Sequence, residues 1–167
     1  MAEPPRNGWL RLDDEALLRQ CREERYKASG PGGQRRNKVE TALRLHHEPS
    51  GVSVQANDSR MLEENRARAL RRLRERIATD VRAPFDAQAP ALPEEFVAQR
   101  GPRGSLGVNA KNPAYALVVA TALDALAAAR GSYARSAEAL GVTTSQLVRF
   151  LQSDREVWRA VERLRKG

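Results

Sequence analysis

Hydrophobic and polar residues alternate along residues 39–46 and again along residues 52–56. This period of two predicts two strands that each bury one face. The sequence EPSG between them predicts a turn, with Gly51 at the position that needs a positive φ, so the two strands are expected to form a β-hairpin. A further strand is expected over about residues 24–28, directly before a glycine-rich segment.

Helical patterns lie on both sides of the hairpin. Asp13 is a suitable N-cap for a short helix that runs to about Cys21. After the hairpin, the sequence MLEENRARALRRLRERIA predicts a helix with one apolar stripe and with arginine on most of its other faces. The stripe consists of Leu62, Ala69, Leu70, Leu73 and Ile77.

The C-terminal third of the chain shows only helical patterns. Asn112 and Pro113 predict the start of an apolar helix, and Gly131 predicts its end. Two short helices with a turn at Gly141 follow, which is helix-turn-helix patterning. A last helix is expected from Ser153. The inward residues of these helices are expected to include Ala137, Leu140, Val142, Leu147, Phe150, Val157, Trp158, Val161 and Leu164.

Prolines and weak periodicity mark residues 80–111 as a linker. We therefore expect two domains, at residues 10–79 and 112–167. The first is expected to be a small mixed domain with a short sheet packed by a basic helix, and the second an all-α bundle. The predicted fold class is α+β.

Charge indicates the class of partner. The chain carries a net charge of +8, with 41% hydrophobic and 30% charged residues, which is typical of a folded protein that binds a polyanion. Nucleic acid is favoured over a membrane surface. Cys21 is the only cysteine, which excludes an internal disulfide, and no apolar run has the length of a signal peptide or a membrane span. A cytoplasmic location is expected.

The segment SGPGGQ matches neither a Walker-type loop nor a dinucleotide fingerprint. The longer run ASGPGGQRRNKVETALRLHHEPSGVSVQ, followed by SRMLEENRARAL, resembles the catalytic domain of class I peptide chain release factors over roughly residues 12–78. The residues that carry the resemblance are Ser29, Gly30, Gly32, Gly33, Gln34, Asn37, Pro49, Gly51, Gln55, Arg60, Asn65 and Arg66.

The resemblance implies hydrolysis of the ester that joins a nascent peptide to transfer RNA, in the peptidyl transferase centre of the large ribosomal subunit. Gly32, Gly33 and Gln34 would be catalytic, with the Gln34 amide N–H stabilising the developing oxyanion. The implied partners are the ribosome, ribosomal RNA and peptidyl-tRNA, with a glutamine methyltransferase that would modify Gln34. A monomer without cofactor or metal is expected. His46 and His47 would point to opposite faces of a strand and are expected at the surface.

Basic residues surround the glycine loop and continue onto the following helix. Glutamates on that helix would fit a merely solvated face, but arginine outnumbers them, so RNA contact is favoured. The candidate RNA-binding residues are Lys27, Ser29, Arg35, Arg36, Asn37, Lys38, Arg44, Arg60, Asn65, Arg66, Arg68, Arg71 and Arg72.

The resemblance is closest to single-domain, codon-independent rescue hydrolases, because no stop-codon-reading domain has a counterpart in these residues. The helix-turn-helix could be a DNA-binding module, an RNA or ribosome anchor, or an inert bundle. Two other hypotheses stay open: a non-enzymatic nucleic-acid-binding regulator, and a ribosome quality-control binder without turnover. Candidate contacts in the C-terminal unit are Thr143, Thr144, Ser145, Gln146 and Arg149.

Overall fold

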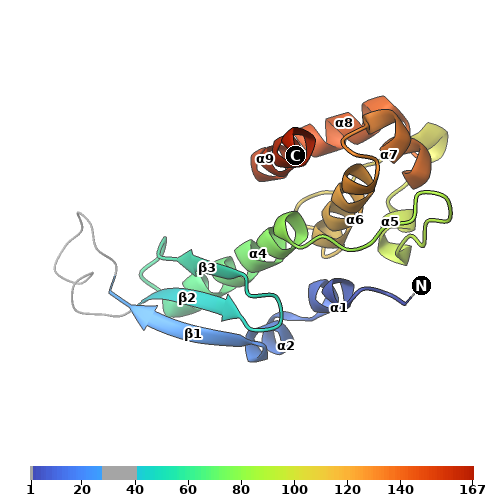
Figure 1. Cartoon of the computed structure of the whole chain (residues 1–167). Helices are drawn as coiled ribbons and strands as arrows, with labels where there is room; N and C mark the ends of the chain where they lie inside the picture. Colours follow the sequence, from blue (N-terminus) through green and yellow to red (C-terminus); the bar gives the residue numbers. More distant parts are fainter. Residues whose placement is uncertain (1, 28–40) are drawn as a thin grey trace. The chain divides into compact units, whose positions relative to one another are not determined.

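The computed structural model describes residues 2–27 and 41–167 (Figure 1). The chain divides into a first unit of residues 12–77 and a second unit that combines residues up to 11 with residues 78–167. The first unit contains a three-stranded antiparallel sheet, and the second is built on helices. These features confirm the α+β fold class expected from the sequence.

The sheet of the first unit has the strand order β1-β2-β3. Its strands are β1 (Cys21–Tyr26), β2 (Ala42–His47) and β3 (Ser53–Ala56). The predicted hairpin is confirmed as β2 and β3, and Gly51 in its turn has a φ of 74°, which glycine adopts without a steric penalty. Strand β1 begins at Cys21, before the expected start at Glu24, because Cys21 pairs with His47 at the end of β2.

Helices α2 (Asp14–Arg19) and α4 (Leu62–Asp80) flank the sheet strands in sequence, and α4 lies along the sheet in Figure 1. The Asp13 carboxylate accepts the N–H of Ala16 at 2.8 Å, which confirms Asp13 as the N-cap of α2. On α4 the predicted apolar stripe is buried at Ala69, Leu70, Leu73 and Ile77.

His47 is fully buried, so the expectation that both histidines lie at the surface is wrong for this residue. It continues the alternation that buries Leu43 and Leu45, and it contacts Gln20, the C-cap of α2. Its Nε2 lies 2.8 Å from Gln20 Oε1 and its Nδ1 lies 2.6 Å from Ser50 Oγ. The Gln20 oxygen only accepts, so Nε2 donates to it. Burial lowers the pKa of His47 and favours the neutral ring, in which Nδ1 accepts from the Ser50 hydroxyl.

The second unit contains α6 (Tyr115–Ala128), which is buried on all sides from Tyr115 to Leu126. Gly141, with a φ of 71°, ends α7, and Thr143 caps α8, as the helix, turn and helix pattern predicts. The last helix begins later than Ser153, because the Asp154 carboxylate caps it. The remaining elements described here are α1 (Pro5–Arg11), α5 (Glu94–Ala98), the 3-10 turn η1 (Pro102–Gly104), α7 (Tyr133–Leu140), α8 (Thr144–Gln152) and α9 (Arg155–Lys166).

Residues 80–111, which the sequence suggests as a linker, belong to the second unit and contain α5 and η1. Phe96 of α5 is fully buried. The Arg100 guanidinium donates to the Leu140 carbonyl at 3.1 Å, at the end of α7. The carbonyl of Gly104 accepts the N–H of Thr143 at 3.0 Å. This segment therefore packs against the turn between α7 and α8.

A cluster of three charged side chains, two of them buried and one partly buried, joins distant segments of the second unit. Arg6, from α1, donates to both carboxylate oxygens of Asp124 in α6, at 2.8 and 2.7 Å. Arg82 approaches the same carboxylate at 3.0 Å, and Asp124 also accepts the N–H of Ala83 at 3.0 Å. Burial and the neighbouring Arg6 charge lower the pKa of Arg82 to about 10. Neither α1 nor this cluster was predicted from the sequence pattern.

We expect Asp124→Asn to destabilise the second unit by about 3–5 kcal/mol, because it leaves the buried guanidinium of Arg6 and the partly buried one of Arg82 without their counter-ion. Both tryptophans of the chain, Trp9 and Trp158, belong to this unit, so urea unfolding followed by tryptophan fluorescence reports on it. The matched control, Glu138→Gln on the exposed side of α7, is expected to change stability by less than about 0.5 kcal/mol. Equal effects of the two changes would contradict the assigned role of Asp124.

We expect the first unit to lose stability as the pH falls below about 6.5, the pKa of histidine in an unfolded chain. Burial holds the pKa of His47 below that value, so the unfolded chain binds a proton that the folded unit does not. Amide hydrogen exchange of β2 across this pH range measures the effect. His47→Gln should flatten the pH dependence, whereas His46→Gln, on the opposite strand face, should retain it.

Candidate functional site

The candidate catalytic residues Gly32, Gly33 and Gln34 lie outside the described residues, as do five candidate RNA-binding residues. These five are Ser29, Arg35, Arg36, Asn37 and Lys38. The structure does describe both attachment points of this segment. Tyr26 at the end of β1 pairs with Ala42 at the start of β2, so the segment connects two neighbouring strands at one end of the sheet.

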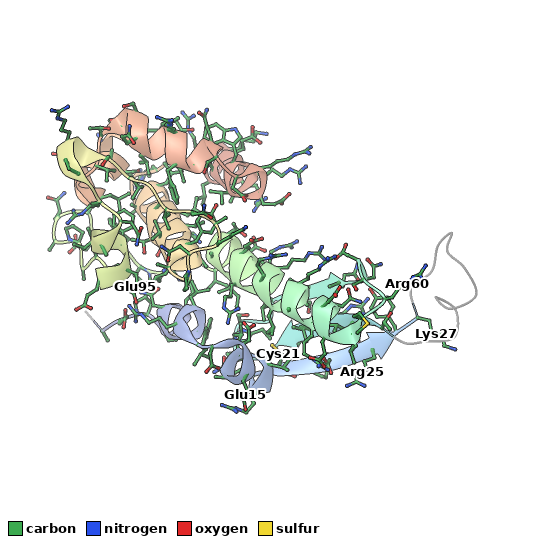
Figure 2. All side chains as sticks on the ribbon, turned by 180° about the vertical axis from the view of Figure 1, so that it is seen from behind. Glu15, Cys21, Arg25, Lys27, Arg60 and Glu95 are labelled. Atoms are coloured by element: carbon green, nitrogen blue, oxygen red, sulfur yellow. The ribbon has the colours of Figure 1, made fainter. Side chains whose placement is uncertain are left out.

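Two exposed cations stand beside these attachment points. Lys27 follows β1 directly, and Arg60 lies in the turn before α4. Figure 2 shows both side chains directed outward at the same end of the first unit. Positive charge that faces solvent at this end can contact the phosphates of an RNA that approaches it.

Arg44 occupies the solvent-facing side of β2, between its two neighbouring strands. Its guanidinium lies 3.4 Å from the Glu24 carboxylate and 3.5 Å from the Gln55 side-chain oxygen. It also lies 5.8 Å from the ring centre of Tyr26. Arg44 thus adds a cation to an exposed strand face that also carries an aromatic ring.

The four candidate RNA-binding arginines of α4 divide into two groups, according to their partners. Arg66 donates to Glu23 at 2.8 Å and also pairs with Glu63, and the hydrogen bond from Arg66 holds the pKa of Glu23 below its usual value. Arg72 donates to Asp58 at 2.6 Å and to the Gln55 carbonyl at 2.9 Å. These two arginines join α4 to the sheet and its following turn, so part of the basic charge supports the fold.

The arginines of the second group form weaker salt bridges or none with the acidic side chains that the structure describes. Arg71 is exposed and has no acidic partner within residues 2–27 and 41–167. Arg68 lies 3.9 Å from Asp58, a distance at which a salt bridge is weak. The counter-ions Glu23 and Asp58 come from β1 and from the turn before α4, and neither was predicted as a partner of α4 from the sequence. Their acidic character was visible in the sequence, but their proximity to α4 was not.

Asn65, a candidate RNA contact, is fully buried. Its Nδ2 donates to the carbonyls of Thr41 and Ser59, each at 2.8 Å, and its Oδ1 accepts the N–H of Ser59 at 2.9 Å. The side chain therefore ties Thr41, directly before β2, to the turn before α4. All its hydrogen-bonding groups are used inside the unit, so its direct contact with RNA is not available in this structure.

The candidate contacts of the second unit lie on α8 and at its N-cap, with Arg149 in the last turn of the helix. The Thr143 hydroxyl accepts the N–H of Gln146 at 3.2 Å and so caps the helix. Thr144, Ser145 and Arg149 are exposed, and Gln146 is partly exposed. The polar side chains of Thr144, Ser145 and Arg149 therefore face solvent and could contact a nucleic acid, whereas the Thr143 side chain caps the helix.

The described residues offer little conventional catalytic machinery. Across residues 2–27 and 41–167, no group of three His, Cys, Asp or Glu side chains could hold a metal ion. Burial raises the pKa of the Cys21 thiol to about 11, so it stays protonated at neutral pH and is a weak nucleophile. None of the helices in the described ranges has the length and apolar character needed to cross a membrane.

Comparison with known proteins identifies relatives of a segment that covers most of the first unit and continues into residues 78–99 of the second. A family model described as RF-1 domain matches residues 16–99. Peptide chain release factor 2 of Paramagnetospirillum magneticum is 40% identical over 84 residues, which cover 50% of this chain and 23% of that protein. Peptide chain release factor 1 of Lacticaseibacillus casei is 46% identical over 68 residues, 41% of this chain and 18% of that protein. The chain thus spans less than a quarter of the length of these relatives.

We expect Asn65→Asp to destabilise the first unit by about 2–4 kcal/mol, because a carboxylate cannot donate to the Thr41 and Ser59 carbonyls and would be buried as a charge. Amide hydrogen exchange of β2 and β3 measures the loss within this unit. Asn57→Asp, at an exposed position of the same turn, is the matched control and should leave exchange nearly unchanged. Similar exchange in both variants would show that the Asn65 hydrogen bonds do not hold the turn.

Proposed function

Because this chain belongs to the family of proteins that carry an RF-1 domain, we propose that it hydrolyses peptidyl-tRNA on stalled ribosomes or large subunits, independently of a stop codon. The ribosome, its large-subunit RNA and peptidyl-tRNA are the proposed partners, in the cytoplasm. One observation supports the proposal most directly: the family match includes the glycine loop, both strands that flank it and all of α4.

The geometry of the first unit supports a site at one end of the sheet. The loop that contains Gly32, Gly33 and Gln34 leaves β1 after Tyr26 and returns before Ala42, which pair with one another. Lys27 and Arg60 flank these positions and are exposed. Cations at this end would contact RNA backbone and guide the loop toward the ester of a bound peptidyl-tRNA.

The proposed mechanism depends on positioning and hydrogen bonding. Gly32 and Gly33 would let the main chain approach the terminal ribose closely, because glycine lacks a side chain. The Gln34 N–H would stabilise the oxyanion that develops as water attacks the ester carbonyl, and the leaving 3′ oxygen. The Gln34 side chain would admit water and exclude larger nucleophiles, and it is the proposed target of a methyltransferase. A monomer that needs neither cofactor nor metal completes the proposal.

Two further functions have some support. Thr144 and Ser145 at the start of α8 and Arg149 in its last turn are exposed, and a nucleic-acid-binding regulator would present such side chains to a groove. A ribosome quality-control binder would use the same cations without turnover. Both differ from the hydrolase in one respect, since neither requires Gln34.

We expect the chain to release labelled peptide from ribosomes stalled on a messenger without a stop codon. Gln34→Ala and Gly33→Ala should each reduce the release rate about a hundredfold or more, because they alter the group that orients water or the backbone that approaches the ester. Gln88→Ala, at an exposed position of the second unit, is the matched control and should release peptide at the original rate.

The same preparations separate the alternatives. Retained binding to the large subunit without release, from intact ribosomes and from split large subunits, would favour the quality-control binder. Specific binding of duplex nucleic acid without ribosomes, unchanged by Gln34→Ala, would favour the regulator. Release that increases only when a stop codon occupies the ribosome would contradict codon independence.

A further inference from the structure

Two aromatic rings and a guanidinium group meet where α7 approaches α9. Tyr133, the first residue of α7, stacks on Trp158 of α9 with ring centres 6.4 Å apart and planes 15° from parallel. The Arg165 guanidinium lies 4.4 Å from the centre of the Tyr133 ring and donates to the Tyr133 hydroxyl at 3.0 Å. Both rings are only partly buried, so aromatic surface remains available to solvent.

The spacing along α9 explains this arrangement. Trp158 and Arg165 are seven residues apart, which places them on the same side of the helix with a separation of about 10.5 Å along its axis. The Tyr133 ring contacts both side chains. The preceding turn comes close to Arg165, because a Cβ added to Gly131 would lie 3.1 Å from Arg165 Cγ, and Gly131 has a φ of 82°. Arg130, next to it, is exposed.

The outer side of α9 adds positive charge beside the rings. At about 100° per residue, Arg155, Arg159 and Lys166 fall within about 40° of one another around the helix, and all three are exposed. Glu156 pairs with Arg159 at 2.7 Å, which partly offsets that charge. Among the described residues, Arg130, Arg155 and Lys166 have no acidic partner. These cations are therefore available to phosphates.

We propose that this surface binds single-stranded RNA, with an unpaired base against the aromatic pair and the backbone along the cations of α9. The surface, named the α9 patch, consists of Arg130, Tyr133, Arg155, Trp158, Arg165 and Lys166. Aromatic rings beside unpaired cations form a stacking platform for unpaired bases, whereas bases inside a duplex cannot reach such rings. The patch is separate in sequence from the α8 candidates, and its binding does not require peptidyl-tRNA hydrolysis.

Tryptophan fluorescence of the full chain tests the stacking contact. In a Trp9→Phe background all tryptophan emission comes from Trp158, because the chain has two tryptophans. Addition of a mixed-sequence single-stranded RNA should quench this emission, and the matching RNA duplex should quench it much less. Unchanged emission at RNA concentrations that saturate binding, or equal quenching by the duplex, would overturn the proposal.

Affinity measured by anisotropy of a labelled RNA tests the contribution of each part. Trp158→Ala should weaken binding of the single strand about tenfold. If circular dichroism shows that this variant does not fold, the surface variant Arg155→Gln/Lys166→Gln tests whether the α9 patch contacts RNA phosphates. It should reduce the slope of log affinity against log salt by about 1.4, since each lost phosphate contact accounts for about 0.7.

The matched control removes the same charge elsewhere on the second unit. Arg103→Gln/Lys111→Gln changes two cations that lie outside α7 and α9, and it should leave the salt slope nearly unchanged. If the slope of log affinity against log salt were equal in both double variants, RNA would be held only by general electrostatic attraction. That result would overturn the proposal that the α9 patch binds RNA. Gln34→Ala should retain both quenching and affinity, so failure of the proposed hydrolase and failure of the patch are distinguishable.

Discussion

The carboxylate of Asp124 is the interaction on which the second unit most depends. It lies in the middle of α6 and binds guanidinium groups from two segments that are far apart in the sequence, those of Arg6 and Arg82. Residues 12–77 are inserted between these two segments. A buried carboxylate with two cations is tolerable only when all its hydrogen bonds are made, and Asp124 also accepts the N–H of Ala83. Helices from both ends of the chain, α1 and α9, therefore belong to the same unit.

In the first unit, buried polar side chains set the geometry around the proposed catalytic loop. Asn65 holds Thr41, where the loop returns to the sheet, and His47 joins the end of α2 to the hairpin turn. Both residues are neutral in the folded protein and have hydrogen-bond partners, which lowers the cost of their burial. The loop is thus attached to a part of the sheet that specific hydrogen bonds fix at both ends of β2.

The distribution of acidic partners decides which basic side chains remain available to phosphate groups. Glu23 and Asp58 engage Arg66 and Arg72, whereas Lys27, Arg60 and Arg71 are exposed. A similar division is seen on α9, where Glu156 pairs with Arg159 while Arg155 has no acidic partner among the residues described. Net charge alone therefore overstates the number of cations that can contact phosphate, and local pairing selects them.

The sequence by itself determined the local elements: the hairpin with Gly51, the Asp13 cap, the stripe of α4, and the turn at Gly141 each follow from patterns within a few residues. The glycine loop motif likewise identified the family. Tertiary structure decided which long-range partners meet, as in the pairing of Arg6 with Asp124 and the burial of Asn65 and His47. Periodicity reports which side of an element is buried, but the partner of a buried polar group depends on residues brought together only when the chain folds.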